Sequence, residues 1–215
     1  MKYPNLPIIL LGSGGHAKIL HAILVSLEAT IQGVVDPDPS KAGTSFCGSP
    51  VLGNDDQVFS LDPGKALLVN GVGSTGNTDQ RKLVFEKFTK KGFRFFSVIH
   101  SSAVVFPDVE IGEGVQILPG AIVQPGSTLG ANVLVNTGSI VGHDCKIGDH
   151  THLAPGSILS GGVTIEQECH IGTGASILQQ KKVGQGSIVG ANSLVVRDVP
   201  PRSKVIAPLA RTLGI

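Results

Sequence analysis

An aliphatic residue recurs at every sixth position over roughly half of the chain. The register covers seventeen successive positions without a gap. An amphipathic helix would instead place apolar residues at i, i+3, i+4 and i+7, and a half-buried strand would alternate apolar with polar residues. A six-residue period is typical of a parallel β-helix, in which short strands joined by tight turns stack into a prism. The positions are Ile99, Val105, Ile111, Ile117, Val123, Leu129, Val135, Val141, Ile147, Leu153, Leu159, Ile165, Ile171, Ile177, Val183, Val189 and Val195.

Three repeats of six residues form one triangular coil, so residues eighteen apart are expected to stack at about 4.8 Å, the spacing between paired strands. The aliphatic residue points inward, and the residue two positions earlier is usually small or β-branched, as at Ala121, Ser127 and Val133. Glycine supplies the backbone conformations that tight corners need, which accounts for much of the content of 29 glycines. The seventeen repeats predict between five and six coils, enough to bury a core by stacking alone.

The residues before the repeats have a different pattern, with short apolar runs separated by glycine loops and amphipathic stretches. We expect strands at 8–11, 31–35, 66–70 and 93–98, and helices at 18–27 and 78–91. Alternation of strands with helices predicts a parallel sheet. The chain should therefore consist of a small Rossmann-like α/β domain over residues 1–98, a β-solenoid over 99–200 and a C-terminal tail over 201–215.

A glycine loop follows the first expected strand. Gly12, Gly14 and Ala17 match the G-x-G-x-x-G/A pattern, and Asp36 follows about twenty residues later. Backbone amides of such a loop can approach a diphosphate, the next helix N-terminus favours its charge, and the acid can accept from a nucleoside. Only about ninety residues precede the solenoid, half of a dinucleotide fold, which favours a nucleoside diphosphate over NAD. A tight turn without a ligand remains the alternative, and His16 would contact a phosphate or cap the helix.

Composition excludes several classes of protein. The formal net charge is +1, with 17 Lys and Arg against 16 Asp and Glu, so no basic surface indicates a nucleic-acid partner. The apolar run at 8–11 is too short for a membrane span, and no signal-peptide pattern precedes it. Three cysteines, Cys47, Cys145 and Cys169, suggest a reducing, cytoplasmic location rather than a disulfide scaffold. The second and third of them occupy the small inward position and are expected in the core.

Histidines are the unusual residues of the repeat region. The pair His143-Asp144 interrupts a repeat at its turn, where an imidazole can take up a proton while a carboxylate fixes its tautomer. A solvated turn histidine is the alternative. His152 and His170 are eighteen residues apart and should stack on one edge. Two ligands without a third in register do not make a metal site, so we expect no metal.

The loop Gly12-Ser13-Gly14-Gly15-His16-Ala17-Lys18, followed by repeats that carry Asn136-Thr137-Gly138-Ser139-Ile140-Val141-Gly142-His143-Asp144-Cys145, resembles the bacterial hexapeptide-repeat sugar acyltransferases. The likeness is to N-acetyltransferases acting on nucleotide-linked 4-amino-4,6-dideoxy sugars, the bacillosamine and perosamine enzymes, and extends to sialic acid O-acetyltransferases. It implies a left-handed β-helix and a homotrimer. It also implies acetyl-CoA as co-substrate, bound between neighbouring helices, with a nucleotide-linked amino sugar as the acceptor.

The resemblance also implies roles for particular residues. His143 would be the general base for the sugar amine and Asp144 its orienting carboxylate, with direct attack on the thioester and no role for Cys145 as a nucleophile. The residues expected at acetyl-CoA are Asn136, His152, Gly161, Gly190 and Ala191. The residues expected at the nucleotide sugar are Gly12, Ser13, Gly14, Gly15, His16, Asp36, Gly73 and Arg81.

Two segments depart from the family pattern. The closing segment Ile206-Ala207-Pro208-Leu209-Ala210-Arg211 keeps only a proline and a nearby basic residue, which weakens the expected contact of the tail with CoA. The stretch Gln179-Gln180-Lys181-Lys182 replaces the usual Pro-Gly turn, and Lys181 falls at a small inward position, so we predict a local bulge. Sugar O-acetylation with the same base and a non-catalytic nucleotide-sugar-binding role remain the alternatives to N-acetylation.

Overall fold

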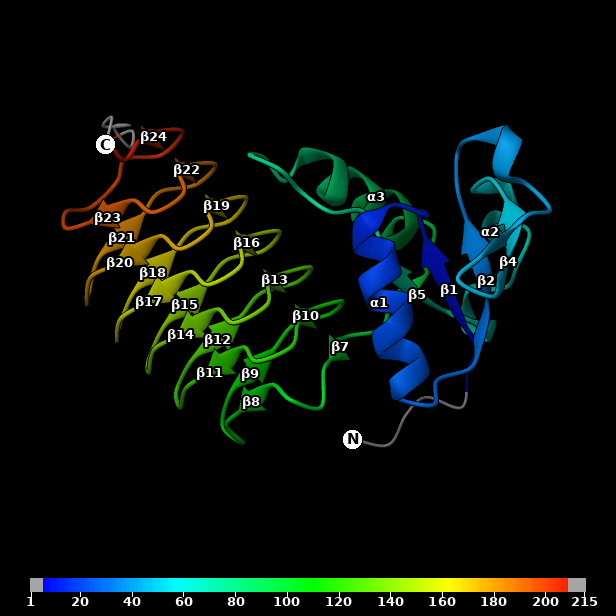
Figure 1. Cartoon of the computed structure of the whole chain (residues 1–215), viewed down its shortest axis with the longest axis horizontal. Coiled ribbons are helices and arrows are strands. Elements are labelled where there is room, and N and C mark those ends of the chain that lie inside the picture. Colours follow the sequence, from blue (N-terminus) through cyan, green and yellow to red (C-terminus); the bar gives the residue numbers. More distant parts are fainter. Residues whose placement is uncertain (1–5, 209–215) are drawn as a thin grey trace, which may run out of the picture.

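The computed structural model describes residues 6–208. An α/β unit is followed by a long stack of short strands, and Figure 1 shows α1 (Gly15–Ser26) on the side of the α/β unit that faces the stack. The described residues contain no helix long and apolar enough to cross a membrane. The predicted role of the tail at CoA falls largely on residues 209–215, which lie outside the described residues.

The sheet of the α/β unit has the order β3-β4-β2-β1-β5-β6 and is parallel except for the β3–β4 hairpin. All four residues of β1 are buried, as expected for a strand covered on both faces. The sequence pattern predicted β1, β2 and β5 but missed the hairpin, in which β3 has only two residues and β4 contains Pro50. The strands are β1 (Ile8–Leu11), β2 (Ile31–Val35), β3 (Ser45–Phe46), β4 (Ser49–Gly53), β5 (Leu67–Asn70) and β6 (Arg94–Phe95).

Helices cover both faces of this sheet. The face covered by α1 includes Leu20, Leu24 and, from the solenoid, Leu118 and Leu134, so this helix joins the two units in one core. The opposite face is covered by α3 (Asp79–Thr89) and α2 (Asp56–Phe59), with Phe88 fully buried. Short 3-10 turns occupy Pro39–Lys41 and Pro63–Lys65. The first helix starts three residues earlier than the predicted 18–27, because the Lys18 N–H already bonds the Gly14 carbonyl.

The solenoid consists of three parallel sheets, and residues eighteen apart are paired as predicted up to the pairing of Ile177 with Val195. The last pairings, such as Ile188 with Lys204, have a spacing of sixteen residues. The predicted strand 93–98 is split: β6 belongs to the α/β sheet, and β7 begins the solenoid. The first sheet holds β7 (Val98–Ile99), β10 (Gln116–Ile117), β13 (Leu134–Val135), β16 (His152–Leu153), β19 (His170–Ile171), β22 (Ile188–Val189) and β24 (Lys204–Val205). The second holds β8 (Val104–Val105), β11 (Ile122–Val123), β14 (Ile140–Val141), β17 (Ile158–Leu159), β20 (Ser176–Ile177) and β23 (Leu194–Val195). The third holds β9 (Glu110–Ile111), β12 (Thr128–Leu129), β15 (Lys146–Ile147), β18 (Thr164–Ile165) and β21 (Lys182–Val183).

Every aliphatic residue of the six-residue register is the second residue of a two-residue strand. These side chains and the small residues two positions earlier form one continuous core, which includes Cys145 and Cys169 at 0% exposure. The predicted inward positions are therefore confirmed. We call the turns from the first to the second sheet, such as 136–139, the first corner. The turns from the second to the third sheet, such as 142–145, are the second corner.

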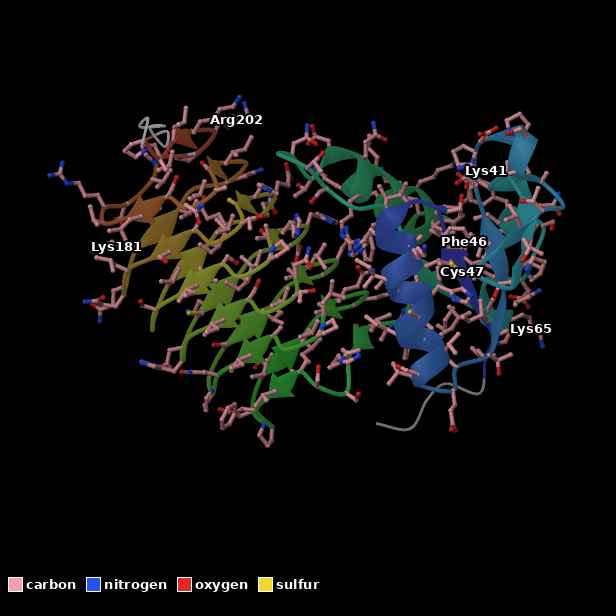
Figure 2. The ribbon with its side chains drawn as sticks, viewed as in Figure 1. Lys41, Phe46, Cys47, Lys65, Lys181 and Arg202 are labelled. Carbon is pink, nitrogen blue, oxygen red and sulfur yellow. The ribbon has the colours of Figure 1, made fainter. Side chains whose placement is uncertain are left out.

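The bulge predicted at Lys181 is wrong. Strand β21 pairs with β18 in register, and the Thr164 N–H bonds the Lys181 carbonyl. Gln180 adopts the same positive φ (58°) that Asp144 has at its corner (58°), so the turn forms without Pro-Gly. Lys181 directly precedes β21, the last strand of the third sheet, and Figure 2 shows it at the end of the stack remote from the α/β unit.

Candidate active site

A cavity of about 470 Å³ lies along the first corner of the later coils. Its wall includes Asn136, His152, Gly190 and Ala191, four of the five residues predicted to bind the cofactor. Residues 74–76, from the loop that joins β5 to α3, form another part of the wall. We call this space the solenoid cavity.

Two polar contacts hold His152 in that wall. Its Nδ1 lies 2.5 Å from Ser74 Oγ, and its Nε2 lies 3.1 Å from Asn136 Nδ2. The ring also packs against His170 at a centroid distance of 5.0 Å, which confirms the predicted stacking of the two histidines. Burial, together with the nearby His170 and Arg81, lowers the pKa of His152 to about 2. This imidazole is therefore neutral at physiological pH.

A second cavity, of about 390 Å³, lies between the α/β unit and the solenoid. We call it the interdomain cavity. His16 and Gly73 line it from the α/β unit, and Leu134 lines it from the solenoid. Ser74, Thr75, Asn136 and His152 line both cavities, so the two spaces meet at these residues.

His16 faces the solenoid. Its Nε2 lies 2.7 Å from Oε1 of Gln116, a fully buried side chain of β10. Burial, and next the charge of Arg81, lower the pKa of His16 to about 4, against the raising effect of its bond to Gln116. No side chain caps the N-terminus of α1, so the alternative that His16 caps the helix is wrong.

Arg81 lies behind the 71–78 loop and is only 1% exposed. Its Nη1 donates to the carbonyls of Asn70 (3.1 Å) and Val72 (3.0 Å). Among residues 6–208, Nε and Nη2 have no hydrogen-bond partner. Burial lowers the pKa of Arg81 to about 9, and no acidic partner offsets that burial. In this structure Arg81 supports the loop rather than lining either cavity.

The glycine loop is held in place by Asp36. The Asp36 carboxylate accepts the Ser13 N–H at 3.0 Å, the Ser13 hydroxyl, the Asp38 N–H and the Lys41 ammonium at 3.0 Å. Burial alone would raise the pKa of Asp36, but these donors outweigh burial and lower it to about 2. Gly12 has a φ of 93°, which requires glycine. Asp36 is thus engaged within the chain, and its contact with a nucleoside stays a prediction. The contacts of Gly12, Ser13, Gly14 and Gly15 with the diphosphate also stay predictions.

The second corner carries the His143–Asp144 pair. Nδ1 of His143 lies 2.7 Å from Asp144 Oδ2, and the side chains are 64% and 72% exposed. The imidazole lies against the backbone of Gly161, in the position that a Cβ there would occupy. The Asp144 carboxylate therefore fixes Nδ1, and Nε2 is left for another partner.

The two corners do not meet within one chain. Strand β14 lies between them, so Asn136 and Gly142 are one six-residue repeat apart, at opposite ends of one side of the prism. Six residues of extended chain span about 20 Å. Gly161 consequently lies with His143 and not with the other predicted cofactor-binding residues. Cys145 is buried next to the pair, and burial raises the pKa of its thiol, so it is not poised as a nucleophile. Among residues 6–208, no group of three or more His, Cys, Asp or Glu side chains could hold a metal ion.

Sequence reasoning missed Lys41, Ser74, Asn70 and Gln116. Gln116 and His152 are both first residues of strands in the first sheet, in the row Val98, Gln116, Leu134 and His152. A glutamine between Val98 and Leu134 in that row is the one signal that could have revealed Gln116 as a functional residue. Ser74 carried no signal, since only the folded loop brings it to His152.

Comparison with known proteins agrees with this geometry. The family model of the PglD N-terminal domain matches residues 7–88, and that of the GMPPB C-terminal domain matches residues 96–192. A perosamine N-acetyltransferase variant from Caulobacter crescentus, solved with CoA and GDP-perosamine, is 33% identical with a TM-score of 0.86, over 100% of both chains. The acetyltransferase domain of PglB from Neisseria gonorrhoeae, solved with acetyl coenzyme A, is 35% identical with a TM-score of 0.85, over 94% of this chain and 96% of that one.

The chain therefore belongs to the hexapeptide-repeat sugar N-acetyltransferases, and it is an acyl-CoA-dependent enzyme of that family. WeeI from Acinetobacter baumannii, 28% identical over 97% of this chain and 100% of that one, has the same fold with a TM-score of 0.84. The predicted fold, a Rossmann-like domain followed by a left-handed parallel β-helix, is confirmed.

Proposed function

We propose that this enzyme transfers the acetyl group of acetyl-CoA to the amine of a nucleotide-linked 4-amino-4,6-dideoxy sugar. The observation that carries the proposal is the exposed His143–Asp144 pair on a chain that is 33% identical, over its whole length, to a perosamine N-acetyltransferase. The solenoid cavity suits the acyl donor, because Gly190 and Ala191 form a wall without bulky side chains. The adjoining interdomain cavity suits the acceptor sugar, and the amides of the glycine loop suit its diphosphate.

In this mechanism His143 Nε2 takes the proton of the amine while the amine nitrogen attacks the thioester carbonyl carbon. The new C–N bond forms, the C–S bond breaks, and His143 passes the proton to the leaving sulfur of CoA. Asp144 at 2.7 Å holds the Nδ1 proton and stabilises the imidazolium. The Gly161 N–H has no acceptor among the described residues and is available for the developing oxyanion.

The environments of the histidines support this choice of base. His16 and His152 are held neutral by burial, with pKa values lowered to about 4 and about 2, and an imidazole that resists a proton is a poor base at pH 7. His143 is exposed to water, its Nδ1 lies 2.7 Å from the Asp144 carboxylate, and its Nε2 has no partner among the described residues, so Nε2 can take up the proton of the amine.

We further propose a homotrimer whose sites lie between subunits. The outer face of the second sheet carries a row of apolar side chains that nothing covers within residues 6–208: Val104 (51% exposed), Ile158 (43%), Leu194 (60%) and the partly exposed Ile122 and Ile140. That face lies between the two corners. Packing it around a symmetry axis brings the second corner of one copy, with His143, against the first corner of the next.

The test is a thiol-release assay with acetyl-CoA and a panel of UDP-, dTDP- and GDP-linked 4-amino sugars, with free sialic acid as comparator. We expect turnover on one amino sugar and a loss of about a thousandfold in kcat in His143→Ala, the size of a general-base contribution. Turnover on sialic acid alone would favour O-acetylation. Full activity in His143→Ala would contradict the mechanism, and light scattering on the same samples should give the mass of a trimer.

A further inference from the structure

The orientation of Gln116 sets the position of the proton on His16. Its Nε2 lies 2.8 Å from the Asn70 carbonyl oxygen, which can only accept a hydrogen bond. The amide nitrogen must therefore face Asn70, and the amide oxygen must face His16 Nε2 at 2.7 Å. Since that oxygen carries no hydrogen, His16 Nε2 is the protonated nitrogen of the ring.

This leaves the other nitrogen of His16 as a hydrogen-bond acceptor. The ring is neutral because burial and Arg81 hold its pKa at about 4, so Nδ1 carries a lone pair. No donor among residues 6–208 bonds to Nδ1, although the residue lines the interdomain cavity. A proton-accepting nitrogen does not attract phosphate, which argues against the expected contact of His16 with the diphosphate.

His152 is fixed in the opposite tautomer by the same logic. The Asn136 Oδ1 accepts the Thr137 N–H at 2.8 Å, so Asn136 Nδ2 must face His152 Nε2 and donate to it. The His152 proton is therefore on Nδ1, and it is donated to Ser74 Oγ at 2.5 Å. Because Ser74 accepts this bond, its own hydroxyl proton is free to point into the cavities.

We propose that His16 Nδ1 and the Ser74 hydroxyl form an acceptor–donor pair that binds a hydroxyl or amino group of the acceptor sugar, with Gln116 as the positioning residue for His16. Such a substrate group can donate a hydrogen bond to His16 Nδ1 and accept one from the Ser74 hydroxyl. The identity of the ligand rests on the function proposed above. The chemistry is assembled across the domain boundary, since Gln116 belongs to the solenoid and both His16 and Asn70 to the α/β unit.

Variants of His16 separate the two ring nitrogens. In His16→Asn the amide oxygen can replace Nδ1, whereas in His16→Gln the amide reaches the position of Nε2 and Nδ1 is lost. With the amino sugar that is turned over in the panel, or GDP-perosamine as the first probe, we expect His16→Gln to raise the acceptor KM about tenfold and His16→Asn less than about threefold. The kcat and the KM for acetyl-CoA should stay within about twofold in both variants, since neither ring nitrogen of His16 is expected to contact acetyl-CoA.

Gln116→Met tests the positioning role, since methionine is similar in shape but cannot bond to His16 or Asn70. It should raise the acceptor KM about fivefold. Thermal melting of each variant shows whether the fold is retained. Equal defects in His16→Asn and His16→Gln would overturn the proposal, and so would a Gln116→Met variant with an unchanged acceptor KM.

The tautomer can be measured without any substrate. In protein labelled with ¹⁵N-histidine, with His16→Asn used for assignment, long-range ¹H–¹⁵N spectra should show His16 protonated at Nε2 and His152 at Nδ1 at pH 7. In Gln116→Met the His16 Nε2 proton should exchange faster with water. A His16 ring protonated at Nδ1 would overturn the inference even if the acetyl-transfer assay succeeded, and failure of that assay would leave this measurement intact.

Discussion

The solenoid holds two histidines in opposite environments, one on the first sheet beside the first corner and one at the second corner. On β16, next to the first corner, His152 is 4% exposed, has a polar partner on each nitrogen and stacks on His170. At the second corner the His143 side chain is 64% exposed and, among residues 6–208, has one hydrogen-bond partner, Asp144. The same side chain is therefore a fixed neutral hydrogen-bonding group in one place and an exposed group, proposed as the base, in the other.

The difference shows that burial, rather than residue type, decides what a histidine can do. Removing an imidazole from water disfavours its charged form, and neighbouring cationic groups add to this effect. At the second corner the imidazole is exposed to water and lies beside a carboxylate. The mechanism proposed above needs both places, one to bind the donor and one to accept the proton, and it therefore requires two neighbouring chains.

The strongest test of this comparison is to combine two kinds of chain in one oligomer, one with a defective second corner and one with a blocked solenoid cavity. His143→Ala removes the base of the second corner, and Ala191→Trp fills the solenoid cavity at the first. Each variant alone should be nearly inactive, but an equal mixture, unfolded and reassembled or co-expressed, should recover about a quarter of wild-type activity because random trimers pair intact corners.

The control is the same mixture without reassembly, which should stay inactive. Recovery only in reassembled samples supports a site between subunits. A reassembled mixture as inactive as its parents would show that His143 and the cavity must belong to one chain.

A smaller effect is expected when the charge at the second corner is removed without changing its shape. Asp144 has a φ of 58°, which asparagine also tolerates, so Asp144→Asn keeps the backbone. The amide can still accept from His143 Nδ1, but it no longer stabilises the imidazolium. We expect kcat to fall about 10- to 100-fold with little change in either KM, measured by thiol release. A large rise in KM with constant kcat would instead assign the aspartate to binding.

Displacing the imidazole should have a similar or smaller effect. A Cβ on Gly161 would overlap the His143 ring, and Gly161 does not have a positive φ, so Gly161→Ala should move the ring without straining the backbone. We expect kcat to fall about tenfold, as for a misplaced base. Gly64→Ala is a matched control, since its new Cβ meets only an ordinary contact and lies in another part of the chain. Equal activity of the two variants would show that the ring has room to move.

Burial of His152 should lower the stability of the folded protein at acid pH. The folded pKa of His152 (about 2) lies below its ordinary value of 6.5, so the unfolded chain binds more protons below pH 6.5 and stability falls as the pH falls. At pH 5 this costs about 2 kcal/mol per chain. Urea unfolding at fixed protein concentration should therefore show a smaller loss of stability between pH 8 and pH 5 in His152→Asn than in the wild type. Parallel pH profiles would contradict the burial argument.

Much of the fold could be predicted because its signals are local and repeated. A six-residue register predicts inward side chains wherever it continues, and even Lys181 did not interrupt the strand pairing. The β3–β4 hairpin and α2 were missed because a two-residue strand, a strand that contains Pro50 and a one-turn helix leave little pattern. The His143–Asp144 pair was found because adjacent residues can interact without help from the fold.

The contacts of the interdomain cavity could not be predicted in this way. His16 and Gln116 are one hundred residues apart, and Ser74 and His152 are seventy-eight apart, with no periodicity linking them. Arg81 was expected at the nucleotide sugar, and only the structure showed that its side chain bonds to the carbonyls of Asn70 and Val72 behind the 71–78 loop. Such pairs depend on how α1 and the 71–78 loop pack on the first sheet.

By itself, then, the sequence determined the prism, its core and the residues at each corner, because stacking is a near-neighbour interaction that every repeat reproduces. Only the tertiary structure decided which histidines are neutral and which nitrogen carries the proton. Those properties depend on burial and on amides held by another part of the chain, and both exist only after the two units have packed together.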